Sequence, residues 1–164
     1  MAGLEDLYRE IIIDHYRSPR NRGELETPPA TRTEGFNPLC GDEIVVYLQL
    51  GEGEGDDRMI EEIRIGGQGC SISQSSASMM SAAVKGKTIA EVEALTHAFK
   101  AMMSIHESSL DADAEATDVE VPTEVKLGDL EALRGVVKFP VRIKCATLAW
   151  NTLAEGIHQA TTPA

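Results

Sequence analysis

Residues 44–65 have the alternation and composition of a β-hairpin. They read IVVYLQL from Ile44 to Leu50, GEGEGDD from Gly51 to Asp57 and MIEEIRI from Met59 to Ile65. The two apolar runs are rich in β-branched residues, and the glycine-rich acidic segment between them is a turn signal. We therefore expect two antiparallel strands, and we expect the strand pattern to break at residues 66–69, which read GGQG.

Apolar residues at helical spacing surround this hairpin on both sides. Before it, the chain predicts a helix over residues 3–16 and a loop over residues 18–42, with one short strand near residues 31–34. After it, we expect four helices and one extended stretch at residues 136–141. The helices are expected from residue 71 to a cap at Gly86, from a Thr88–Glu91 capping box onward, over residues 127–135, and from about Lys144 to His158.

These elements predict an α+β fold, in which a small antiparallel sheet of about three strands packs against helices. The length of 164 residues fits a single domain over residues 1–164. An insertion at about residues 104–125 contains seven acidic residues and no lysine or arginine. We interpret it as a solvated insertion, with an acidic loop that faces a partner as the alternative.

Charge and composition exclude two classes of partner. The chain has 15 basic and 27 acidic residues, a formal net charge of -12, and only 4% aromatic residues. Such a chain repels phosphates and offers few rings for base stacking, so we expect no nucleic-acid partner. No apolar run approaches the roughly 18 residues needed to cross a bilayer, and the N-terminus lacks the features of a secretory signal. We expect no membrane partner and a cytoplasmic location.

The three cysteines of the chain, Cys40, Cys70 and Cys145, lie where loops meet regular elements. Cys70 and Cys145 are expected at helix starts, where backbone N–H groups favour a thiolate. Asp42 follows Cys40 by two residues, so in an extended segment both side chains would point to the same side. Three thiolates and one carboxylate would suit zinc. The residues alone leave a second interpretation open, in which all three cysteines are buried and inert.

Four stretches of the chain, in this order, resemble the successive signatures of the NifU N-terminal/IscU-like iron–sulfur cluster assembly superfamily. They are DHYRSPRNRG at residues 14–23, NPLCGD at residues 37–42, GCSISQSS at residues 69–76 and KCATLA at residues 144–149. Within the superfamily the chain is most similar to the SufU branch. The stretch between Cys70 and Cys145 is long, Lys144 stands where scaffold proteins carry a histidine, and residues 139–144 depart from the scaffolds' chaperone motif.

The resemblance implies a zinc site made by Cys40, Asp42, Cys70 and Cys145. It also implies a partner, the pyridoxal-phosphate-dependent cysteine desulfurase SufS, with the downstream SUF assembly machinery as the destination of the sulfur. Cys40 matches the family's sulfur acceptor, and a histidine of the desulfurase is thought to replace Cys40 on zinc. The implied function is that of an enzyme, a zinc-dependent sulfurtransferase that accepts persulfide sulfur for iron–sulfur cluster biogenesis.

Two other functions remain open for the same residues. One is an assembly scaffold that builds and transfers a transient iron–sulfur cluster, because three thiolates and one oxygen ligand suit a labile cluster. The other is a domain whose zinc only stabilises the fold. Arg142, three residues before Cys145, matches a basic residue of the family and is a candidate for electrostatic support of the anionic site. A plain surface arginine is the alternative. His15 is expected to be structural.

Overall fold

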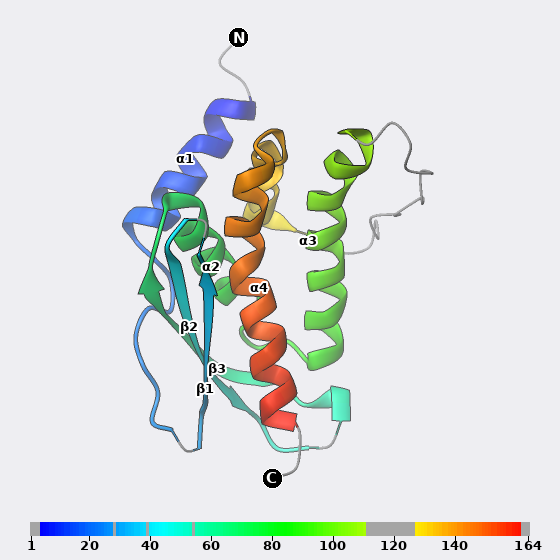
Figure 1. Ribbon diagram of the computed structural model, residues 1–164. Coiled ribbons are helices and arrows are strands. Elements are labelled where there is room, and N and C mark those ends of the chain that lie inside the picture. The colour runs from blue at the N-terminus through cyan, green and yellow to red at the C-terminus, as the bar shows by residue number, and fades with distance from the viewer. Residues whose placement is uncertain (1–3, 28, 39, 54, 111–126, 162–164) are drawn as a thin grey trace.

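The computed structural model describes residues 4–27, 29–38, 40–53, 55–110 and 127–161 (Figure 1). Most of the predicted acidic insertion, residues 111–125, therefore lies outside the described residues. The elements in chain order are α1 Leu4–Arg17, β1 Thr31–Asn37, β2 Asp42–Leu50, η1 Gly55–Asp57, β3 Ile60–Gln68, α2 Ser71–Val84, α3 Ile89–Leu110, η2 Gly128–Lys138 and α4 Pro140–Thr161. Of the described helices, none is both long and apolar enough to span a membrane.

The three strands form one antiparallel sheet in the order β1-β2-β3. This confirms the predicted hairpin and the α+β fold class. Helix α4 contacts β1, β2 and α2, and Figure 1 shows it running along the sheet with α3 on its other side. That the whole chain forms one domain stays a prediction.

The core lies between the sheet and the helices that cover it. Trp150 of α4 and Phe99 of α3 stack at its centre with ring centroids 4.9 Å apart, and both are fully buried. The alternating residues Ile44, Val46 and Leu48 of β2 point into the same cluster. This burial of a large apolar surface supplies most of the driving force for folding.

Two strands are longer than the sequence predicted. Strand β1 extends to Asn37 because it pairs with β2 along its whole length. Strand β3 continues to Gln68, so the prediction that residues 66–69 break the pattern is wrong for the first three of them. Gly67 pairs with Ile44 at a φ of 106°, and a Cβ there would overlap the backbone carbonyl of Glu43. The glycines allow close strand approach instead of ending the strand.

The C-terminal helices also begin and end at different residues from those predicted. The 3₁₀ helix η2 continues past Gly135 to Lys138, and α4 begins at Pro140, so residues 136–141 are not extended. Proline is favoured at the first position of a helix because its missing N–H would have no partner there. Cys145 consequently lies in the second turn of α4, and its predicted place at a helix start is wrong.

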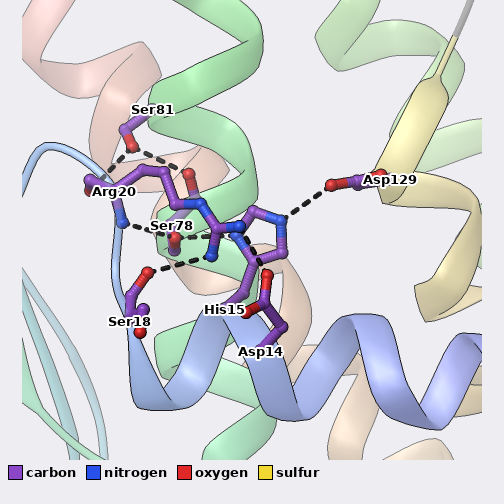
Figure 2. A network of polar contacts seen from close by, with 7 residues as sticks. All are labelled: Asp14, His15, Ser18, Arg20, Ser78, Ser81 and Asp129. Carbon is purple, nitrogen blue, oxygen red and sulfur yellow. Dashed lines mark hydrogen bonds and ion pairs between the residues drawn. The ribbon is translucent and has the colours of Figure 1, made fainter.

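His15 of α1, whose side chain is buried, connects three helices through a network of polar contacts (Figure 2). Its Nε2 lies 2.9 Å from the Asp129 carboxylate of η2, and its Nδ1 lies 2.8 Å from the Ser78 hydroxyl of α2. A carboxylate only accepts, so Nε2 donates; in a neutral ring Nδ1 then accepts the hydroxyl proton. The Ser78 oxygen also accepts the backbone N–H of Arg20. His15 therefore links α1 to α2 and η2, in agreement with its predicted structural role.

Candidate metal centre

The turn between β1 and β2 carries the first two residues of the site. Asn37 and Asp42 are the last paired residues of the two strands, and Cys40 lies in the turn that they close. Gly41 has a φ of 66°, a left-handed conformation that glycine adopts without strain. The sequence argument for this pair was therefore wrong in its geometry, since Cys40 and Asp42 converge through a tight turn rather than along an extended segment.

Helix α4 places Cys145 against this turn. The Cys145 thiol lies 3.2 Å from the Cys40 sulfur, and the ligand atoms of Cys40, Asp42 and Cys145 all lie within 4.8 Å of one another. Two thiolates on one tetrahedral zinc would be roughly 3.8 Å apart, from Zn–S bonds of about 2.3 Å. The fold thus brings three of the four predicted ligands to within about the spacing that a single zinc ion requires.

The Asp42 carboxylate is fully buried at the centre of this group. Its Oδ1 accepts the backbone N–H of Cys70 at 2.9 Å, and its Oδ2 accepts the Asn37 amide at 3.4 Å. Gly69 makes this position accessible, because a Cβ at residue 69 would lie 2.5 Å from Oδ1 and 3.1 Å from the Asp42 Cα. The Asp42 carboxylate therefore occupies a space that only a glycine at residue 69 leaves free.

Cys70, the fourth predicted ligand, is the N-cap of α2. Its sulfur accepts the backbone N–H of Ser73 at 3.4 Å, as expected for a cysteine at a helix start. It lies outside the cluster of three ligand atoms, although its thiol interacts with that of Cys145. The structure brings Cys70 next to the site without completing a four-ligand cage, and the set of four ligands stays a prediction.

The charges around the site change the pKa values of two of its residues. Burial raises the pKa of the Cys145 thiol well above its usual value, and contacts with Cys40 and Asp42 add to the effect. The Arg142 side chain is exposed, and attraction to Cys70 followed by contact with Cys145 raises its pKa. Arg142 therefore lies beside Cys70 and Cys145 at the protein surface, and its electrostatic support of the site stays a prediction. The side chain of Lys144 is also exposed.

These residues fit a zinc ion. A buried carboxylate beside the buried Cys145 thiol is costly unless a cation neutralises it, and none of the three cysteines is bound in a disulfide. Sulfur ligands select zinc or iron–sulfur clusters over magnesium or calcium. The donor set thus has the chemistry of a thiolate-rich metal site.

Sequence reasoning did not single out two residues of the site, Asn37 and Gly69. Both belong to motifs that were recognised for their cysteines, and their roles depend on contacts across the fold. For Asn37 the missing information was the register of β1 against β2. For Gly69 it was the approach of the Asp42 side chain.

Known proteins match most of this chain. The family model described as the NifU-like N-terminal domain matches residues 7–146. The chain is similar to the zinc-dependent sulfurtransferase SufU of Bacillus subtilis strain 168, with 42% identity over 156 residues, 95% of this chain and 92% of the relative. It is also 38% identical to the iron–sulfur cluster assembly scaffold protein IscU of Streptococcus pyogenes serotype M1, over 98% of this chain and 88% of the relative.

A solved structure shares the fold over almost the whole chain. It comes from Fervidobacterium islandicum AW-1 and is described there as a candidate iron–sulfur cluster assembly scaffold protein for the SUF system. The TM-score is 0.65 at 27% identity, covering 93% of this chain and 98% of the other. The arrangement of sheet and helices around the candidate metal centre is therefore shared with cluster assembly proteins.

Proposed function

The chain belongs to the NifU-like N-terminal domain family, and from that membership we propose that it is a zinc-dependent sulfurtransferase. It accepts persulfide sulfur from a cysteine desulfurase and passes it to iron–sulfur cluster biogenesis. The observation that carries this proposal is the convergence of Cys40, Asp42 and Cys145 within 4.8 Å, with Cys40 on a turn. The similarity to a relative named zinc-dependent sulfurtransferase SufU supports it.

Cys40, Asp42, Cys70 and Cys145 are the residues that would hold zinc. Zinc bound by them would supply the positive charge that keeps the thiols deprotonated at neutral pH. Asp42 is fixed by strand β2 and Cys145 by helix α4, whereas Cys40 lies in the β1–β2 turn and is partly exposed. A turn residue can move without disturbing the core, so Cys40 is the sulfur best able to leave the group.

The proposed reaction is an exchange between sulfur atoms. The Cys40 thiolate attacks the outer sulfur of the donor's persulfide, and a new sulfur–sulfur bond forms as the donor's bond breaks. The electron pair leaves on the donor's inner sulfur as a thiolate, so Cys40 carries the persulfide and no external oxidant is needed. The exposed guanidinium of Arg142 beside the site would attract the anionic persulfide.

The partner we propose is a pyridoxal-phosphate-dependent desulfurase of the SufS type, with the SUF assembly machinery as acceptor. The test mixes the zinc-loaded chain with such a desulfurase and cysteine, and follows alanine formation and the mass of Cys40. We expect faster turnover and the gain of one sulfur atom on Cys40. Cys40→Ser should abolish both effects, whereas Ser71→Ala, an exposed change beside Cys70, should keep them. Unchanged stimulation by Cys40→Ser would reject the role of Cys40.

An assembly scaffold is the second candidate, because a relative at 38% identity is named as one. Three sulfur ligands and one oxygen ligand suit a labile cluster that can be handed on. The exposed lysine at position 144 weighs against it, since the scaffold proteins that the chain resembles carry a histidine at that position. Anaerobic reconstitution followed by mixing with an apo-acceptor separates the two functions. Transfer of an intact cluster would favour the scaffold, and failure to transfer would remove it.

A further inference from the structure

We propose that Asn37 is a positioning residue that holds Asp42 and Cys145 as the resident ligands and thereby leaves Cys40 as the sulfur that departs. This inference rests on the proposed function, because it assigns a cause to the reactivity of Cys40. Asn37 is only 6% exposed. Its amide nitrogen lies 3.4 Å from Asp42 Oδ2 and 3.7 Å from the Cys145 sulfur.

The sheet register explains how one amide reaches both ligands. Asn37 and Asp42 face each other as the pair that closes the β1–β2 turn, and the Cys40 N–H donates to the Asn37 carbonyl at 3.4 Å. Cys145 arrives from α4, which packs on β1 and β2. Asn37 therefore links the two rigid elements that carry ligands, while its own backbone supports the turn that carries Cys40.

The chemistry of the amide fits two anionic neighbours. An asparagine amide nitrogen has two N–H donors, and a carboxylate and a thiolate are both acceptors. Hydrogen bonds to charged acceptors are about twice as strong as those between neutral groups. Asn37 thus reaches both ligands with one amide group and fixes where their ligand atoms point.

Among the described residues, the three other ligands accept N–H donors and the Cys40 sulfur does not. Asp42 accepts from Cys70 and Asn37, Cys145 accepts from Asn37, and Cys70 accepts from Ser73. Within the described part of the chain, the Cys40 sulfur contacts the Cys145 thiol. An N–H donor anchors a sulfur and withdraws electron density from it, so the sulfur without one is both the most mobile and the most nucleophilic.

The test is a double-mutant cycle on zinc affinity, measured by competition with a chromophoric chelator and independent of any desulfurase. Residues that orient metal ligands typically change metal affinity by about 10–100-fold when removed, and we expect that loss for Asn37→Ala. In an Asp42→Ala background the same substitution should have a much smaller effect, because one of its two partners is gone. In a Cys40→Ser background the full loss should remain.

Two further variants separate hydrogen bonding from shape. Asn37→Leu keeps the approximate size of the side chain, removes its donors and adds no charge, so it should bind zinc no better than Asn37→Ala. Thr33→Ala removes another buried polar side chain from β1 and should keep the original affinity. In cobalt-substituted protein, the sulfur-to-metal charge-transfer band should shift for Asn37→Ala and stay in place for Thr33→Ala. Circular dichroism of each variant checks that it folds.

The outcomes distinguish this inference from the proposed function. Normal zinc affinity in Asn37→Ala or Asn37→Leu would overturn the role of Asn37 and leave the sulfurtransferase intact. The loss of zinc affinity caused by Asn37→Ala could instead disappear in the Cys40→Ser background and persist in the Asp42→Ala background. That result would also overturn the role of Asn37, because Asn37 would then act through Cys40 and not through Asp42. A chain that binds no zinc at all would overturn both.

Discussion

Replacing Gly69 by alanine should push the Asp42 carboxylate out of the metal centre. The added Cβ would lie 2.5 Å from Oδ1, whereas ordinary contacts begin at 3.4 Å, so the oxygen must retreat by about 0.9 Å. Ligand positions in metal sites tolerate only about 0.2 Å. The same movement would lengthen the bond from the Cys70 N–H to Oδ1, now 2.9 Å. We therefore expect Gly69→Ala to lower zinc affinity by at least the ~10–100-fold typical of lost ligand support.

The assay is chelator competition on refolded protein, with thermal unfolding of the metal-free form as the check on folding. The matched control is Gly66→Ala on the preceding strand β3, where the new Cβ would meet the Val45 Cβ at an ordinary 3.9 Å. This variant should keep the zinc affinity of the original chain. A folded Gly69→Ala variant that binds zinc as tightly as Gly66→Ala would refute the reasoning, because Asp42 would then not need its present position.

Three other predictions concern His15, the Cys145 thiol and the apolar core. His15→Ala removes a buried imidazole with two polar partners, so the free energy of unfolding in urea should fall by about 2–4 kcal/mol while zinc affinity stays the same. Burial raises the pKa of Cys145, so its proton is still bound at neutral pH and must leave on metal binding. Calorimetry in buffers of different ionisation enthalpy should therefore show proton release, and the zinc affinity should rise with pH. Chelation of zinc should lower the melting temperature but leave the far-UV circular dichroism signal, because the apolar core lies largely outside the site. Complete unfolding on chelation would instead indicate a purely structural metal.

Local pattern predicted the strands and helices whose apolar faces are regular. The alternation of residues 44–50 and the helical spacing that ends at Met102 correspond to β2 and α3. The capping box was also confirmed, since the Glu91 N–H bonds the Thr88 hydroxyl at 3.2 Å. In these segments local preference and tertiary burial favour the same conformation, so the pattern is sufficient.

The prediction failed where tertiary contacts decide the conformation. Gly66 and Gly67 look like a strand end, yet pairing with β2 keeps them extended. Cys145 was expected at a helix start, but α4 begins five residues earlier at Pro140. Cys40, Asp42 and Cys145 were grouped by family resemblance, and spacing alone left inert cysteines as the alternative. Their convergence depends on the register of the β1–β2 turn and on how α4 packs, which no local pattern encodes.

X-ray absorption at the zinc K-edge of the zinc-loaded chain examines the proposed ligand set itself. We expect a first shell of three sulfur atoms at about 2.3 Å and one oxygen atom at about 2.0–2.2 Å, and one sulfur fewer in Cys40→Ser with zinc retained. A shell of nitrogen and oxygen atoms only, or a sulfur count that Cys40→Ser leaves unchanged, would contradict a site in which Cys40 is a ligand able to depart.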